Sequence, residues 1–317
     1  MSRATDIMKC KYPIVQAPMT WLTSAELAAA VANAGGLGSL GPNAGQVDPL
    51  DDPIESGEAL RAEIRKTQSL TNGPFGINYI IDGSEFSDAF LKVMIEEKVG
   101  YVIVCDPLPD LDTSLIKYMK DNGLTVIYRQ SNPTVKGAIK AEQAGADIIV
   151  ATGYDEGGGM PNVPVGTMTI TAVIADAVSV PVLAAGGIVN RKTVNAAFAL
   201  GAEGVFCGTR FLAAKESPIS DITKQDIVDC DMDDLILTAN QFCPWRCTPH
   251  EQSRIALERY QKGDMPNDLI GNGSFRQGML LGDLDHGIVT VNNAINFIRS
   301  IDSCEDIINE MMADYKG

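Results

Sequence analysis

The segment Ile148–Ser217 decides the fold, and its sequence is IIVATGYDEGGGMPNVPVGTMTITAVIADAVSVPVLAAGGIVNRKTVNAAFALGAEGVFCGTRFLAAKES. It contains three short apolar runs, at residues 148–151, 181–185 and 204–207, and none of them alternates with polar residues. Continuous apolar runs of this length are typical of parallel strands that are buried on both faces. A helical pattern follows each of the first two runs, so the segment predicts repeated strand–helix units.

Glycines follow each of these three strands. The loop Gly153–Gly159 comes after the first, Gly186-Gly187 after the second, and Gly208-Thr209 after the third. At the carboxyl end of a strand, a glycine lets a phosphate group approach the backbone N–H groups that a side chain would block. Two successive loops of this kind late in a β/α chain predict a phosphate site. Glycine-rich loops also occur for packing alone, which is the alternative.

Five earlier apolar runs bring the number of predicted strands to eight. They lie at residues 12–17, 37–40, 75–79, 101–104 and 125–128. Helical patterns separate them, and no two strands follow each other directly. This alternation favours a parallel α/β fold, and eight units predict a (β/α)8 barrel.

The pattern changes after Lys215. Residues 218–271 carry many charged residues, several prolines and two closely spaced cysteines. We therefore expect a lid or substrate subdomain at 218–271, inserted into a barrel formed by 1–217 and 272–317. The helices of the last segment are expected to return to the barrel.

Composition excludes several classes of protein. The 317 residues are 45% hydrophobic, which supports a large core and argues against disorder. A formal charge of −16 makes nucleic acid and anionic membrane surfaces poor partners. No apolar run is long enough to span a bilayer, and the amino terminus lacks a signal-peptide core. Seven cysteines without framework spacing indicate reduced thiols, so we expect a cytoplasmic protein.

Five segments form a recognisable set of motifs. They are PIVQAPM at 13–19, ANAGGLG at 32–38, FGIN at 75–78, AAGGI at 184–188 and LGAEGV at 200–205, continuing through GTRF at 208–211. As a set they resemble one family, the nitronate monooxygenases (2-nitropropane dioxygenases) together with the FMN-dependent enoyl-ACP reductase II enzymes. The resemblance covers nearly the whole chain, and its carboxyl-terminal part is more similar to the enoyl reductase branch.

The resemblance implies a barrel that holds one FMN, with NADH or NADPH as the reductant. Ala17, Pro18 and Met19 would line the flavin ring, and Asn78 would bond the ring or the ribityl chain. The phosphate would be bound by Gly186, Gly187, Gly208 and Thr209, and Asp155, Gly157 and Gly158 are added to the expected cofactor site.

Arg129 stands where relatives often carry a lysine near the flavin, and a cation there would favour the anionic reduced flavin. The alternatives are that Arg129 forms a surface ion pair and that Asn78 caps a strand end.

The sequence departs from the family at one position. Relatives typically carry a histidine where this chain has Gly159. In nitronate monooxygenases the imidazole is assigned as base or electrostatic partner of the nitro substrate, and in enoyl-ACP reductase II it is linked to substrate or cofactor handling. Neither His250 nor His286 replaces it by position. We expect the missing side chain to leave room for a bulkier substrate, and Tyr154 and Arg129 are the predicted catalytic residues. The proton would come from Tyr154, the lid or water, and the substrate carbonyl would be polarised by Arg129, Tyr154 or a backbone N–H.

Other chemistry is less well supported. Cys243, Cys247 and His250 have soft ligand atoms at close spacing, but a structural zinc site wants four ligands, so we expect lid packing and no metal. Cys105 can approach the flavin or serve as a small hydrophobe. Asp155 and Glu156 are a possible acid/base pair, although loop acids are usually solvated.

Three functions follow from this pattern. The first is an NAD(P)H-dependent reduction of an activated C=C bond, as in an enoyl thioester or enone, by hydride transfer from flavin N5. The second is oxidation of nitronates with O2 by a nitronate monooxygenase, and the third is an FMN-binding homologue without activity. We expect a small-molecule substrate and a homodimer.

Overall fold

The computed structural model describes residues 2–317, and its centre is a barrel of eight parallel strands. Neighbouring strands follow the order β1-β9-β8-β6-β5-β4-β3-β2. Hydrogen bonds between Leu37 and both Ile14 and Gln16 join the two ends of the sheet. The strands are β1 (Ile14–Gln16), β2 (Gly38–Leu40), β3 (Phe75–Ile80), β4 (Tyr101–Asp106), β5 (Thr125–Gln130), β6 (Ile148–Thr152), β8 (Val182–Ala185) and β9 (Gly204–Cys207). The predicted barrel and its eight strands are confirmed.

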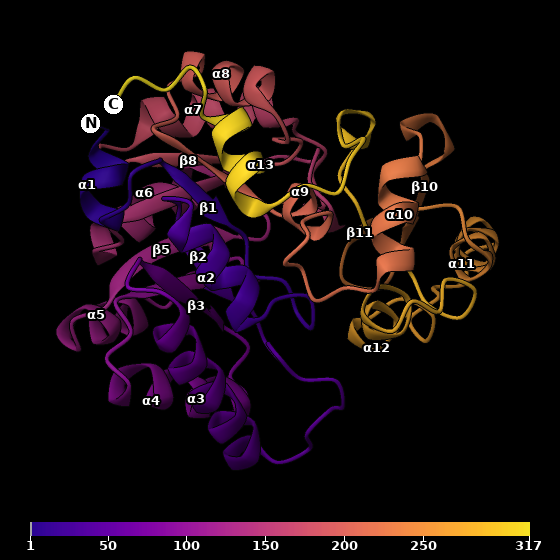
Figure 1. Cartoon of the computed structure of the whole chain (residues 1–317), viewed down its shortest axis with the longest axis horizontal. Helices are drawn as coiled ribbons and strands as arrows, with labels where there is room; N and C mark the ends of the chain where they lie inside the picture. Colours follow the sequence, from indigo (N-terminus) through magenta and orange to yellow (C-terminus); the bar gives the residue numbers. More distant parts are fainter. Residues whose placement is uncertain (1) are drawn as a thin grey trace.

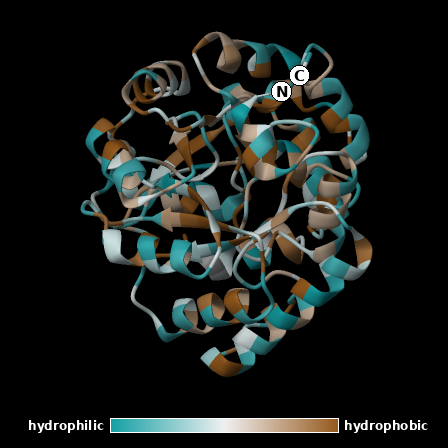
Figure 2. Ribbon diagram, turned by 90° about the vertical axis from the view of Figure 1, so that its left-hand side faces the viewer, coloured by the Kyte–Doolittle hydropathy of each residue, from teal (hydrophilic) through white to brown (hydrophobic). Residues whose placement is uncertain are grey.

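Helices cover the outside of the barrel, as Figure 1 shows. They are α2 (Ala25–Asn33), α3 (Pro53–Leu70), α4 (Glu85–Glu96), α5 (Thr113–Asp121), α6 (Val135–Ala144), α7 (Thr167–Ala177), α8 (Arg191–Ala199) and α13 (Cys304–Met311). Side-chain caps fix where these helices begin. The hydroxyl of Ser24 accepts a hydrogen bond from the N–H of Leu27 at the start of α2. The carboxylate of Asp52 accepts from the N–H groups of Ile54 and Glu55 at the start of α3, whose first residue is Pro53. Figure 2 shows hydrophobic residues concentrated on the central strands, whereas the surrounding helices carry hydrophilic and hydrophobic residues in turn.

A short helix, α1 (Arg3–Met8), adds to the core inside the barrel. Ala4 and Met8 are fully buried and belong to the same apolar cluster as Val15, Ile103 and Leu183. The amino-terminal segment therefore closes the end of the barrel that lies away from the glycine loops.

The segment after β9 forms a second unit beside the barrel (Figure 1). It contains α9 (Thr209–Leu212), α10 (Asp221–Asp229), η1 (Met232–Asp234), β10 (Ile236–Ala239), β11 (Pro244–Cys247), α11 (Glu251–Gln261), α12 (Asn272–Phe275), η2 (Arg276–Leu280) and η3 (Ile295–Phe297). A three-stranded antiparallel sheet connects it to the barrel, because β7 (Gly158–Gly159) belongs to the loop after β6 and pairs with β11.

Packing in this unit continues beyond residue 271. Ile219 and Ile227 share one apolar cluster with Met279, Val291 and Ile298. Helix α13 instead packs with α2 and α8 on the barrel. We therefore propose that the chain returns to the barrel near Asp302, whose backbone pairs with Ala214.

Candidate functional site

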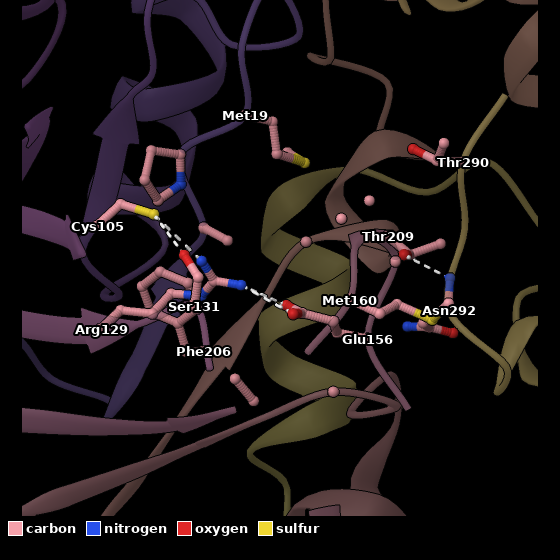
Figure 3. A pocket seen from close by; sticks show the side chains of 18 of the residues that line it. Met19, Cys105, Arg129, Ser131, Glu156, Met160, Phe206, Thr209, Thr290 and Asn292 are labelled. Atoms are coloured by element: carbon pink, nitrogen blue, oxygen red, sulfur yellow. Dashed lines mark hydrogen bonds and ion pairs between the residues drawn. The ribbon is translucent and has the colours of Figure 1, made fainter. Parts of the chain in front are cut away.

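A cavity of about 490 Å³ lies at the carboxyl ends of the strands, between the barrel and the second unit. Its volume is within the range of small-molecule sites. Figure 3 shows side chains from both parts of the fold directed into it. The barrel contributes the ends of β1, β3, β4, β5, β8 and β9, and the second unit contributes Phe242, Cys243, Trp245 and Phe275.

Most of the residues predicted for the cofactor line this cavity. They are Ala17, Pro18, Met19, Asn78, Arg129, Gly157, Gly158, Gly186, Gly187, Gly208 and Thr209. These eleven residues come from six different loops and strand ends. They line one cavity because the barrel topology places the carboxyl ends of all strands at the same end of the fold.

Gly208 leaves open space on the side of the cavity where a phosphate is expected. A Cβ built on Gly208 would meet only Met19 Sδ at 3.5 Å and Ala17 Cβ at 3.8 Å, so it would extend into the cavity without striking the protein. Thr209 is buried, and its Oγ1 accepts from the N–H of Asn292 at 3.1 Å. The hydroxyl proton of Thr209 is therefore free to be donated to a ligand oxygen.

Arg129 forms an ion pair with Glu156 that is largely shielded from solvent. Arg129 is therefore not part of a surface ion pair, and Glu156 is not a solvated loop acid. Its Nη2 donates to Oε2 of Glu156 at 2.7 Å and to Oε1 at 2.9 Å, and its Nη1 donates to Cys105 Sγ at 3.3 Å. The side chains of Arg129 and Glu156 are 16% and 12% exposed, and both residues line the cavity. The expectation that loop acids are solvated is wrong for Glu156, because β5 places a guanidinium directly opposite this loop.

Burial and charge act against each other in this pair. Burial opposes ionisation of Arg129, but the Glu156 carboxylate outweighs it and raises the pKa of the guanidinium. Burial raises the pKa of Glu156, and the neighbouring charge of Arg129 limits that rise. The site therefore holds a fixed cation beside a carboxylate whose proton affinity is increased.

Tyr154 and Asp155 do not line the cavity, although both were predicted for the site. The Tyr154 carbonyl accepts from Arg246 Nη2 at 3.1 Å, and its ring lies under the same guanidinium. Burial opposes ionisation of Asp155, but hydrogen bonds from Thr167 N–H and the Asn293 amide lower its pKa. These two residues hold the loop in place.

Gly159 does not leave the room that its missing side chain suggested. A Cβ built there would lie 2.9 Å from Cys243 Sγ and 3.2 Å from the Trp245 ring. Trp245 pairs with Gly159 across the small sheet and packs on Phe275, with ring centroids 4.8 Å apart. The expectation of extra space is wrong, because two side chains of the lid occupy it.

Cys243, Cys247 and His250, which were considered as metal ligands and expected to pack in the lid, lie in different surroundings. Cys243 lines the cavity, Cys247 is fully buried, and the His250 ring bonds Asp226 at 2.8 Å. Between Ser2 and Gly317, the structure has no group of three or more His, Cys, Asp or Glu side chains that is arranged to hold a metal ion. No helix over the same residues is both long and apolar enough to cross a membrane.

Comparison with known proteins agrees with this geometry. The family model for nitronate monooxygenase matches residues 1–104 and 91–314, which is nearly the whole chain. The chain belongs to the nitronate monooxygenase family. It is therefore a flavin-dependent oxidoreductase.

Family members with different names resemble it to a similar degree. A probable nitronate monooxygenase of Staphylococcus haemolyticus is 32% identical over 278 residues, covering 75% of this chain and 74% of that protein. FabK from Thermotoga maritima, an enoyl-ACP reductase II, superposes with a TM-score of 0.88 at 33% identity, covering 100% of this chain and 96% of that one.

A Mycobacterium tuberculosis protein is 35% identical over 237 residues, which are 74% of this chain and 62% of that protein. It is named (3aS,4S,5R,7aS)-5-hydroxy-7a-methyl-1-oxo-octahydro-1H-indene-4-carboxyl-CoA dehydrogenase. The chain is therefore similar both to a protein named for nitronates and to one named for a carboxyl-CoA thioester.

Several site residues had no signal in the sequence. Glu156 was considered as half of an acid/base pair with Asp155 but was expected to be solvated, Cys243 was considered only as a metal ligand, and Trp245 and Phe275 were not considered. The sequence signal for Trp245 is indirect. A glycine at 159, in place of the family histidine, indicates that another side chain fills that position, but it does not say which one.

Proposed function

We propose that the protein is an FMN-dependent oxidoreductase that reduces an activated C=C bond, of the enoyl thioester or enone type, with NADH or NADPH as reductant. One observation carries this proposal: within the part of the chain that the structure describes, the cavity wall has no imidazole. His250 bonds Asp226, and His286 is exposed and bonds Asp283. Hydride transfer requires positioning and a proton donor, whereas nitronate oxidation in this family is tied to the imidazole.

The glycine wall suits FMN. The N–H groups of Gly186, Gly187 and Gly208 and the hydroxyl of Thr209 would hold its phosphate, and Ala17, Pro18, Met19 and Asn78 would line the ring. Asn78 donates its amide to the Ile103 carbonyl at 2.9 Å, which leaves its Oδ1 as an acceptor for the ligand. A bound flavin would supply hydride transfer between the nicotinamide and the alkene.

The opposite wall suits an acyl group. Phe242, Trp245 and Phe275 give it an apolar surface, and Met160 adds a thioether. Arg129 carries five N–H donors, of which Glu156 and Cys105 use only part, so donors remain for a substrate carbonyl. Such a donor polarises the C=C bond and is worth a few kcal/mol of barrier.

Nitronate monooxygenase activity is the second candidate, because it is the name of the family model and of curated relatives near 32% identity. An FMN-binding homologue without activity is the third.

An anaerobic stopped-flow experiment tests all three. The enzyme is reduced with NADH or NADPH and then mixed with crotonyl-CoA, while flavin absorbance is followed. Rapid reoxidation supports the proposal. O2-dependent consumption of propyl-2-nitronate with no reoxidation by the enoyl thioester would support the second candidate, and no turnover of either would support the third.

A further inference from the structure

We propose that Glu156 is the catalytic acid/base of this site, which moves a proton to and from the α-carbon of a carbonyl substrate. This inference rests on the proposed function, because it assigns the proton-transfer half of that reaction. Its substrate class is a thioester, in which the carbonyl makes the α-hydrogen acidic.

The cavity wall offers few groups that can exchange a proton near neutral pH. Among the described lining residues, the ionisable side chains are Cys105, Arg129, Glu156, Cys207 and Cys243. Arg129 keeps its proton at all working pH values. Burial raises the pKa of Cys207, and it raises that of Cys243 to about 11. Glu156 is the one carboxylate of this set.

The backbone and side chain of Glu156 are both held in place. Arg246 Nη1 donates to its carbonyl oxygen at 2.6 Å, and Arg129 Nη2 contacts both carboxylate oxygens. Figure 3 shows the carboxylate meeting Arg129 inside the cavity, with Met160 and Thr209 beyond it. A base fixed in this way needs little reorganisation when the proton moves.

The surroundings of Glu156 act on its pKa in opposite directions, with a net rise. Burial favours the protonated form, and the charges of Arg129 and Arg246 favour the carboxylate. The thiols of Cys105 and Cys243 are the other ionisable groups near the pair. Opposing influences of this kind are typical of a group that must both take and give a proton.

The pair supplies a base and an electrophile side by side. In one direction, the Glu156 carboxylate takes the α-proton, the C–H electron pair moves into the carbonyl, and Arg129 donates to the resulting enolate oxygen. In the direction of ene-reduction, hydride arrives at the β-carbon, the π electrons move towards the carbonyl, and the Glu156 proton then forms the α-C–H bond. The carboxylate regains its proton from solvent.

The lid explains why the acid/base group stands at position 156. Cys243 and Trp245 crowd the space at Gly159, so even a Cβ there would require one of them to shift. Three residues earlier, the same loop directs Glu156 into the cavity opposite Arg129. Proton transfer is therefore assigned to a carboxylate in place of the family imidazole.

Exchange of α-hydrogens tests this assignment without net redox chemistry. Butyryl-CoA is incubated with the oxidised FMN-loaded enzyme in D2O, and deuterium uptake is followed by mass spectrometry. We expect exchange by the wild type, at a rate that rises with pH through the Glu156 pKa to a plateau, because the ionised form is the base. Glu156→Gln should lower the rate by about 10²–10⁴-fold and remove the pH dependence.

Two further variants separate catalysis from structure. Glu258→Gln makes the same chemical change on the exposed surface of α11 and should leave exchange unchanged. Glu156→Asp keeps the charge opposite Arg129 and should exchange slowly with the pH dependence retained, which decides the matter if Glu156→Gln fails to fold. Exchange by Glu156→Gln within threefold of the wild type, or a flat pH profile for Glu156→Asp, would overturn the inference.

The proposed function fails in a different way. Wild-type enzyme that reduces crotonyl-CoA but exchanges no α-hydrogen would remove Glu156 from the chemistry and leave the ene-reductase intact. Wild-type enzyme that exchanges hydrogen but never reduces the enoyl thioester would support Glu156 and overturn the proposed direction of reduction.

Discussion

Replacing Gly159 by alanine tests whether the lid fills the position of the family histidine. The added Cβ would lie 2.9 Å from Cys243 Sγ and 3.2–3.3 Å from two atoms of the Trp245 ring. Contacts below 3.0 Å force a neighbour to shift, and Trp245 is held by Phe275. Overpacking of this kind costs about 1–3 kcal/mol, so we expect Gly159→Ala to lower the free energy of unfolding by about 1–2 kcal/mol and Gly159→His by more.

The cause can be isolated because the backbone at Gly159 is ordinary. Its φ lies outside the left-handed region, whereas Gly158 has φ +83° and open space around its Cβ position. Cys243→Ala should therefore relieve the cost of Gly159→Ala by roughly 1 kcal/mol, and it should not relieve that of Gly158→Ala, whose cost is backbone strain.

Urea unfolding measures these effects on four single variants, Gly159→Ala, Gly159→His, Gly158→Ala and Cys243→Ala. The couplings come from two double variants, which combine Cys243→Ala with Gly159→Ala or with Gly158→Ala. A stability of Gly159→Ala equal to the wild type, or a coupling to Cys243 no larger than that of Gly158→Ala, would refute the steric explanation. Gly159→His should also fail to improve ene-reduction, because the imidazole must displace Trp245 from the substrate wall.

Three further outcomes are expected. Gly208→Val should fold and raise the Kd for FMN by at least about tenfold, because its side chain enters the phosphate space, while Gly100→Ala, where no atom lies within 4 Å of the Cβ position, should bind FMN normally; the FMN content of the purified variants measures this. Asp226 raises the pKa of His250, so its stabilisation is complete below the unfolded pKa of about 6.5 and is lost as pH rises through the higher folded value; urea unfolding from pH 6 to 9 should show this loss in the wild type and not in His250→Ala. Chelators should leave activity unchanged, because Cys247 is buried and His250 is bound to Asp226, and elemental analysis finding one zinc per chain would contradict this.

The barrel was predictable because its signals are local. Each strand is a short apolar run, and helices such as α3 begin at a capping residue followed by proline. The small sheet was not predictable. Its third strand is Gly158–Gly159, which has no side-chain pattern, and it forms only where β11 passes beside it.

The sequence predicted the site residues that belong to family motifs. It did not predict the residues whose role depends on a contact between two separate segments. Gly186, Gly187 and Gly208 follow strands directly, so the topology alone brings them to one end of the barrel. Glu156 differs, because its partner Arg129 stands on another strand, 27 residues earlier. An acidic residue in a glycine loop is usually solvated, and only the fold shows that this one faces a guanidinium.

Strand β11 joins the lid to the loop Gly153–Gly159. Two consecutive residues of β11 make these contacts. Trp245 covers Gly159, and Arg246 donates a hydrogen bond to the carbonyl oxygen of Glu156. We therefore expect a substitution in this strand to change the shape of the cavity wall and the placement of Glu156 together. For this reason we expect the effects of substitutions at Gly159, Trp245 and Glu156 to depend on one another, and a histidine introduced alone at 159 to meet Cys243 and Trp245.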